Sequence, residues 1–393
     1  MSANPPGILA RAAILLLLWL TGAAMRAPIL VAAPLGPRIA DALSLNQTGL
    51  GALTTLPVLA LGLGAIPAAW LIARFGARNA LIMAVLLTGA ASAARGAAPD
   101  AMLLLIATAA TGLGIAIMQP ALPALVSRWC PGFVALGATV YLNGMMMGEF
   151  IGAGLTLPAL LPAVGGGWRA ALFALSIPIV LLAPFMLIPR LHGERPTLDQ
   201  VGRWPDWRDT RVWRFGGLLG LTASTFFGLN AYMGAVLASK HLSAHIDLVL
   251  AIFNAVQLFA SLFLMATIRR VLATPRLLFA TVTLHIGGLA VVMVSASLWL
   301  IGGVIAISFA SAVQLITLTS LPSLILTPAR AGAVAAGMFA VGYVLAFVVP
   351  LIAGSLVDAS GSITSALYFL LGLNVLCLPL GWSTITGLEI QRR

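Results

Sequence analysis

Two charged side chains stand inside long apolar stretches of the chain. Glu149 lies in the middle of the run from Phe133 to Gly167, which holds no other charge, and Arg26 lies inside a similar run near the N-terminus. None of the other Lys, Arg, Asp and Glu residues falls near the centre of a hydrophobic segment. An ionised side chain at the centre of a bilayer costs about 2.5–3.5 kcal/mol on insertion scales, and such residues generally contact a substrate, an ion or a proton.

Arg26 and Glu149 are predicted at similar depth, because each follows about fifteen residues of its apolar segment at a helical rise of about 1.5 Å per residue. The Arg26 guanidinium is suited to bind a carboxylate or another small anion through two hydrogen bonds, and Pro28 loosens the helix beside it. The alternative is a purely structural ion pair with Glu149. For Glu149 we expect either a coupling carboxylate, alternately paired to Arg26 and protonated, or a permanent counter-ion of Arg26.

Uncharged polar side chains supply the other candidates for substrate contact. Asn254, Gln257 and Ser261 are spaced i, i+3, i+7, which places them on one face of a helix. Tyr141 shares the helical face of Glu149. The complete set of uncharged candidates is Gln119, Tyr141, Asn230, Tyr232, Asn254, Gln257 and Tyr343. Each has an alternative role, since polar side chains in membrane helices also hydrogen-bond across helices, at about 0.6 kcal/mol each.

The composition excludes a soluble protein. Hydrophobic residues make up 61% of the 393 residues and charged residues only 8%, whereas soluble domains carry about 25% charge. The sequence has two cysteines, no cluster with metal-ligand spacing and no pairing of a nucleophile with a base. We therefore expect an all-α membrane protein that is not an enzyme and needs no metal or cofactor.

Twelve apolar runs approach the length that a membrane-spanning helix needs, about 20 residues. They cover residues 11–34, 48–73, 79–95, 101–127, 134–163, 168–189, 213–238, 246–268, 275–297, 299–326, 331–357 and 362–386. With the N-terminus in the cytoplasm, sixteen cations lie inside and four lie outside, namely Arg38, Arg95, Arg169 and Lys240. This asymmetry predicts that both termini are cytoplasmic. It also explains the net charge of +11 without a nucleic-acid partner.

The two halves of the chain repeat a short motif. Leu122-Pro123-Ala124-Leu125 closes the fourth predicted span and Leu321-Pro322-Ser323-Leu324 closes the tenth. Such parallel repeats are typical of transporters built from two six-helix bundles. The predicted organisation is an N-terminal bundle over residues 1–190, a cytoplasmic linker over 191–212 and a C-terminal bundle over 213–393.

Several stretches spread along the chain match one family. They are Met25-Arg26-Ala27-Pro28, the segment from Gly112 to Val126, Gly167-Trp168-Arg169-Ala170, and Gly342-Tyr343 followed by Pro350, Gly354, Asp358 and Gly361. In these residues the chain resembles the major facilitator superfamily, and within it the branch of cyanate and 2-nitroimidazole transporters. The resemblance implies the major facilitator fold, with twelve transmembrane helices in two six-helix pseudo-repeats.

The residues and the resemblance together predict a secondary active transporter of a small anionic solute, carboxylate- or cyanate-like, in the bacterial inner membrane. The solute would cross by alternating access between the two halves, coupled to protons or to another ion. Arg26 favours an anion. The alternative is an exporter or importer of small neutral planar compounds, such as nitroimidazoles or drugs. We expect a monomer in the lipid bilayer.

Overall fold

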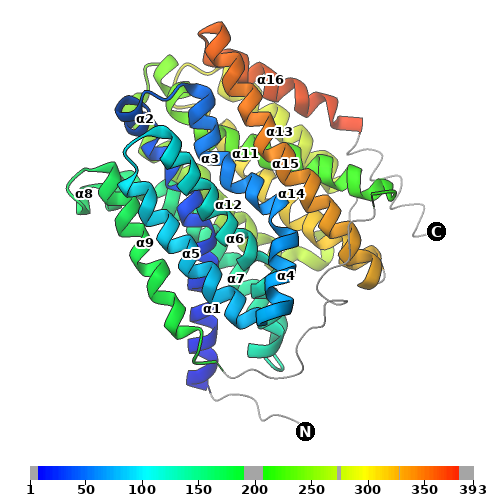
Figure 1. The fold of residues 1–393 in the computed structure, drawn as a ribbon. Coiled ribbons are helices and arrows are strands. Elements are labelled where there is room, and N and C mark those ends of the chain that lie inside the picture. The colour runs from blue at the N-terminus through cyan, green and yellow to red at the C-terminus, as the bar shows by residue number, and fades with distance from the viewer. Residues whose placement is uncertain (1–7, 190–206, 272–275, 327, 380–393) are drawn as a thin grey trace. The chain divides into compact units, whose positions relative to one another are not determined.

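The computed structural model describes residues 8–189, 207–271, 276–326 and 328–379. These residues form helices joined by short connections, and no strand occurs among them (Figure 1). The prediction of an all-α fold is therefore confirmed.

The first half of the chain contains eleven helical elements among its described residues 8–189. In chain order they are α1 (Ile8–Leu30), α2 (Ala32–Leu43), α3 (Gln47–Leu63), α4 (Ala65–Phe75), α5 (Ala77–Ala97), α6 (Ala101–Trp129), α7 (Val134–Glu149), the π-helical segments η1 (Phe150–Gly154) and η2 (Thr156–Leu160), α8 (Leu161–Ala163) and α9 (Trp168–Phe185). The second half contains α11 (Thr210–Ser239), the short 3-10 helix η3 (Ser243–His245), α12 (Ile246–Val271), α13 (Arg276–Val294), α14 (Leu300–Ile325), α15 (Pro328–Ser360) and α16 (Ile363–Leu376).

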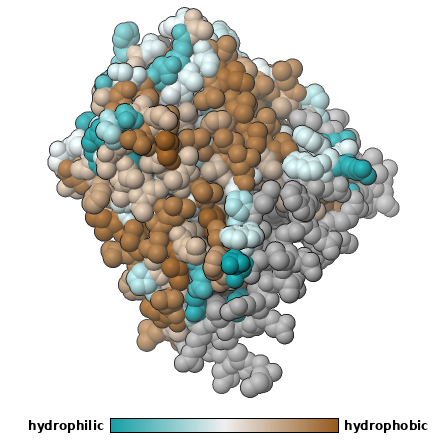
Figure 2. Space-filling model, in the orientation of Figure 1, coloured by the Kyte–Doolittle hydropathy of each residue, from teal (hydrophilic) through white to brown (hydrophobic). Residues whose placement is uncertain are grey.

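The helices have the length and the surface of membrane spans. Nine in the described part of the chain are long and apolar enough to cross a membrane, or ten if one bent pair counts as a single span. Two shorter apolar helices, α3 and α16, fall in the remaining predicted spans. Large apolar side chains stand exposed on the helices, for example Phe259 at 68% and Phe173 at 54%, and hydrophobic residues cover much of the face in Figure 2. Such a surface fits a lipid environment.

Three predicted spans are not straight helices. The span predicted at 11–34 changes from α1 to α2 at Val31, three residues after Pro28, and the span predicted at 48–73 is interrupted at Gly64. The span predicted at 134–163 bends by 58° between Leu136–Gly154 and Thr156–Ala163. Proline and glycine explain these breaks, because proline lacks a backbone donor and glycine stabilises a helix poorly.

The chain divides into two compact units. The first comprises Met1–Arg38 with Leu63–Arg203, and the second comprises Ile39–Gly62 with Trp204–Arg393. Residues 39–62 thus group with the second unit, although the sequence suggested a boundary only in the linker. Of the predicted linker 191–212, residues up to 206 lie outside the described part, and α11 begins at Thr210.

The two units pair their helices in the same way. In the first unit α1 packs on α7, and α5 packs on both α6 and α9. In the second unit α11 packs on α15, and α13 packs on both α14 and α16. The first of the predicted spans in each half therefore contacts the fifth, and the third contacts the fourth and the sixth. This agrees with the internal repeat predicted from the Leu-Pro-x-Leu motif.

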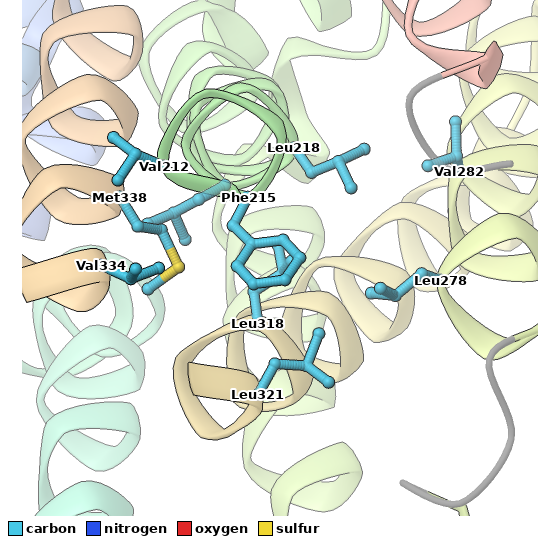
Figure 3. Close-up of a cluster of buried hydrophobic side chains, with 10 residues drawn as sticks. Val212, Phe215, Leu218, Leu278, Val282, Leu318, Leu321, Val334 and Met338 are labelled. Atoms are coloured by element: carbon cyan, nitrogen blue, oxygen red, sulfur yellow. The ribbon is translucent and has the colours of Figure 1, made fainter. Parts of the chain in front are cut away.

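A buried cluster fixes the helices of the second unit against one another. It is formed by side chains of α11, α13, α14 and α15, with Phe215 of α11 among Val334, Met338, Leu318 and Leu321 (Figure 3). All of these residues are at most 4% exposed. Within a membrane such side chains hold helices together by van der Waals packing. The cluster thereby sets the rotation of α11, which carries the two candidate residues Asn230 and Tyr232.

Candidate functional site

A glycine ladder brings α7 into backbone contact with α1. A Cβ atom at Gly144, Gly148 or Gly152 would collide with the carbonyl oxygen of Trp19, Ala23 or Ala27 respectively. The four-residue spacing is the same on both helices, so one face of α7 and η1 runs along one face of α1. The close approach follows the general rule that small residues allow membrane helices to touch.

This contact brings Arg26 and Glu149 together. Arg26 Nε lies 3.6 Å from Glu149 Oε1, and both side chains are 5% exposed. Glu149 Oε2 is buried and has no hydrogen-bond partner among the described residues. The separation is longer than a direct hydrogen bond of about 2.7–3.2 Å. The pair is therefore a buried but loose electrostatic contact, whose carboxylate keeps one oxygen available.

The backbone around this pair departs from regular α-helix. Glu149 is the last residue of α7, and π-helical geometry begins at Phe150, where Leu155 N bonds to Phe150 O at 3.1 Å. On the other helix, α1 ends at Leu30, just after Pro28. Single π-helical turns inside longer helices occur frequently at functional sites. Both partners of the ion pair thus sit next to a helix irregularity.

Arg95 is buried in the first unit. The charge distribution predicts that it lies on the extracellular side, and the structure places it in the last turn of α5 at 0% exposure. Its Nη1 donates to Pro28 O at 2.5 Å, while Nε and Nη2 have no partner among the described residues. One feature of the sequence indicates that Arg95 is buried, namely its small neighbours in Ala93-Ala94-Arg95-Gly96-Ala97. Small neighbours let other helices cover a side chain.

The second unit brings two of the predicted amides together. Asn254 Nδ2 donates to Asn230 Oδ1 at 3.0 Å, and Asn230 Nδ2 donates to Phe226 O at 3.0 Å. Asn254 Oδ1 has no partner among the described residues, although the side chain is 0% exposed. Phe226 and Phe253 flank the amides with ring centroids 5.2 Å apart. The arrangement offers a neutral hydrogen-bond acceptor beside an aromatic surface.

Tyr232 lies in a different part of the second unit from these amides. Its hydroxyl donates to Pro350 O at 2.7 Å and lies 3.4 Å from Gln47 O. A Cβ at Gly51 or Gly354 would collide with this hydroxyl. Because Tyr232 is only two residues from Asn230 on α11, the two side chains leave the helix on different faces. The structure therefore ties Tyr232 to α3 and α15 rather than to the amide pair.

Asp358 holds the beginning of α3. Its two carboxylate oxygens accept hydrogen bonds from Gln47 N and Thr48 N, both at 2.9 Å, and Thr48 Oγ1 donates to the same carboxylate. Asn46 Oδ1 caps a third backbone donor, Gly49 N, at 2.9 Å. The first amides of a helix lack partners within the helix and favour negative charge. Asp358 of α15 therefore caps a helix more than three hundred residues earlier in the chain.

The remaining candidates are dispersed. Gln257 is buried at 2% exposure on α12, and Tyr343 is buried on α15 with its ring stacked on Phe339 at 5.6 Å. Gln119 on α6 and Tyr141 on α7 are half-buried. Two buried polar pairs of the second unit were not predicted from the sequence, Thr222 with Gln314 and Asn374 with Thr225. Only the packing of helices distant in sequence brings their partners together.

The fold and the buried ion pair define the class of protein. Bundled apolar helices that expose apolar side chains, with a carboxylate and a guanidinium buried between two of them, are typical of multi-pass membrane transporters.

The pattern of the Major Facilitator Superfamily matches residues 14–350, and the chain belongs to this family. It is accordingly a transporter of small solutes and not an enzyme.

Known relatives and solved structures agree with this assignment. The chain is 34% identical to the 2-nitroimidazole transporter of Escherichia coli (strain K12) over 212 residues, which is 53% of each chain. The match thus spans about half the length of that relative. It is 26% identical to the cyanate transport protein CynX of the same organism over 356 residues, covering 89% of this chain and 91% of CynX. A crystal structure of a D-xylose–proton symporter shares the fold, with a TM-score of 0.75 over 95% of this chain and 97% of that one, at 13% identity.

Proposed function

We propose that the protein is a secondary active transporter of a small anion, carboxylate- or cyanate-like, with Arg26 as its anion-binding residue. The observation that carries the proposal is the loose buried pair, Arg26 Nε to Glu149 Oε1 at 3.6 Å, in which Glu149 Oε2 has no partner among the described residues. A guanidinium binds a carboxylate or a similar anion in two-point fashion. An entering anion therefore competes directly with Glu149 for Arg26.

Charge balance links this competition to a proton. When the anion occupies Arg26, the Glu149 carboxylate loses its nearest cation while it stays buried at 4% exposure. An ionised carboxylate without a partner in such surroundings is strongly disfavoured, so Glu149 takes up a proton. Release of the anion returns Glu149 to Arg26 and frees the proton. The proposed cycle moves one proton with each anion by alternating access of the two units.

The second unit supplies uncharged contacts in this proposal. Asn230 and Asn254 offer amide groups beside Phe226 and Phe253. The proposed candidates also include Tyr343, Gln257, Gln119 and Tyr141, whereas Tyr232 serves the contact with α3. The location proposed is the bacterial inner membrane with both termini in the cytoplasm, and the proposed state is a monomer.

A second candidate function is transport of a small neutral planar compound, as the name of the 2-nitroimidazole transporter suggests for that relative. It is favoured by the aromatic and amide character of the second unit, since a flat heteroaromatic ring stacks on phenylalanine and bonds to an amide. In that case the Arg26–Glu149 pair is permanent and structural.

A melting-temperature experiment separates the two functions. Small carboxylates, cyanate and neutral azoles are added to purified protein in detergent, because a ligand that binds the folded state raises its melting temperature. If the anion proposal holds, anions stabilise the wild type and the control Arg38→Ala, whose side chain is exposed, but not Arg26→Ala. Stabilisation by azoles in all three proteins, with no effect of anions, would overturn the anion proposal and support the neutral substrate.

The role of Glu149 is tested by transport across a range of pH. In Glu149→Gln vesicles we expect exchange of the solute to continue while its dependence on pH is lost. Uptake with the same pH dependence as the wild type would contradict coupling through Glu149.

A further inference from the structure

A second buried cation of the first unit plays no part in the proposed transport cycle. Arg95 is 0% exposed in the last turn of α5, and its Nη1 donates to Pro28 O at 2.5 Å. Its Nε and Nη2 have no hydrogen-bond partner within the described residues. A buried guanidinium generally has its donors satisfied, because each unmet donor carries a desolvation penalty.

Ser92 adds an independent observation one turn earlier on the same helix. It is also 0% exposed, and its Oγ has no partner within the described residues. Other buried hydroxyls of this unit donate to a carbonyl of their own helix, as Thr88 does to Ala84 O and Ser176 to Phe173 O. Residues three apart lie on the same face of a helix. The hydroxyl of Ser92 and the guanidinium of Arg95 therefore present unused donors on one face of α5.

The charges of the first unit favour an anion at these donors. Its buried ionisable side chains in the described range are Arg26, Arg95 and Glu149, and Glu149 lies beside Arg26. Asp100 is exposed, and its carboxylate accepts Leu103 N at the start of α6. The Arg95 charge thus has no protein carboxylate paired with it among the described residues.

The helix that carries both side chains is packed against α6 and α9. A Cβ at Gly96 would meet Arg169 O of α9 at 2.6 Å, and one at Gly114 of α6 would meet Ala84 O at 2.9 Å. Both contacts show that α5 is packed closely on its neighbours.

We propose that Ser92 and Arg95 form a subsite for a small monovalent anion, of the size of a halide, formate or cyanate. Two guanidinium N–H groups and one hydroxyl are a donor set that binds such an anion. The subsite lies on α5 and is separate from the Arg26–Glu149 pair. It does not depend on whether the transported solute is an anion.

The test titrates anions into the full-length protein in detergent. The protein is dialysed into sodium gluconate, whose anion is too bulky for the subsite. Chloride then replaces gluconate at constant ionic strength while the melting temperature is recorded. We expect a saturable rise for the wild type. Ser92→Ala should need about tenfold more anion, which corresponds to one hydrogen bond to a charged group. The matched control Ser176→Ala should titrate like the wild type, because its hydroxyl is already bonded within its own helix.

Two further variants make the result decisive. Arg95→Met should show no response to chloride, and if it fails to fold, Ser92→Ala still decides the question. Arg26→Ala should keep the response to chloride, which separates this subsite from the proposed transport site, where stabilisation by carboxylates and cyanate depends on Arg26. The proposal is overturned if the wild type does not respond to chloride, if Ser92→Ala titrates like the wild type, or if Arg26→Ala abolishes the response.

Discussion

At the scale of the residue, the Arg26–Glu149 pair is the feature on which the proposed transport depends. Both side chains are buried to the same degree, and Arg26 Nε lies 3.6 Å from Glu149 Oε1. A buried pair gains little net stability over apolar residues, but removal of one partner leaves a charge in surroundings that do not solvate it. The pair should therefore behave as a unit in stability measurements whether or not it contacts the solute.

A double-mutant cycle checks this coupling. We expect Arg26→Gln and Glu149→Gln each to lower the free energy of unfolding by about 3–5 kcal/mol, whereas the double variant should lose much less than the sum. Unfolding in detergent measures all four proteins, with the exposed Arg38→Gln as control. Additive losses in the double variant would mean that the two side chains do not interact.

At the scale of the element, glycine spacing decides how closely helices approach. The α1–α7 contact depends on Gly144, Gly148 and Gly152, each opposite a backbone carbonyl of α1. The same contact places Glu149 one residue beyond Gly148, facing Arg26. The four-residue glycine spacing therefore both allows the two backbones to pack and brings the ion pair together.

Gly148→Ala should separate the two helices. Its Cβ would collide with Ala23 O, and overpacking of this kind costs about 1–3 kcal/mol. We expect a lower melting temperature together with weaker stabilisation by the solute. Gly372→Ala on α16 is the matched control, because a Cβ there meets no atom within 4 Å and alanine favours helix. An equal effect of both substitutions would rule out the proposed contact.

A second element-scale feature is the cap on α3. Asp358 holds Gln47 N and Thr48 N in the second unit, while α4, beyond Gly64, packs on α5 and α6 of the first. Gly64 thus joins a helix attached to one unit to a helix attached to the other.

Asp358→Ala should loosen the start of α3. Loss of a capping side chain costs about 0.5–2 kcal/mol, so amide hydrogens of the first turn of α3 should exchange faster in hydrogen–deuterium exchange. Asp247→Ala serves as control, because Asp247 lies on α12 and accepts a hydrogen bond from the neighbouring Leu248 N. Unchanged exchange at residues 47–49 would contradict the role of Asp358.

At the scale of the whole molecule, the predicted orientation depends on sixteen cations inside and four outside. The four exceptions all donate to backbone carbonyls. Arg38 binds Gly166 O, Arg95 binds Pro28 O, Arg169 binds Ala98 O, and Lys240 binds Met293 O and Ser295 O. A cation at such carbonyls satisfies acceptors that helix ends leave open. These four cations therefore bind carbonyl groups of the fold, which explains why they lie on the predicted outer side although most cations lie on the inner side.

Reporter fusions test the orientation. A fluorescent protein fused after Arg393 should be fluorescent, since it folds in the cytoplasm, and alkaline phosphatase fused after Lys240 should be active outside the membrane. The reverse result at both positions would invert the predicted topology.

The sequence alone determined the membrane character and the helical segments. It also identified Arg26 and Glu149 as charged residues inside apolar segments. These features depend on local quantities, namely the length of apolar runs, the positions of charges along them and the four-residue glycine spacing. The tertiary structure alone decided that Arg95 is buried, that Asn230 meets Asn254 while Tyr232 meets Pro350, and that Asp358 caps α3. These contacts depend on how each helix is rotated about its axis and on which distant helix lies beside it. Packing of many side chains sets both, and no local pattern encodes them.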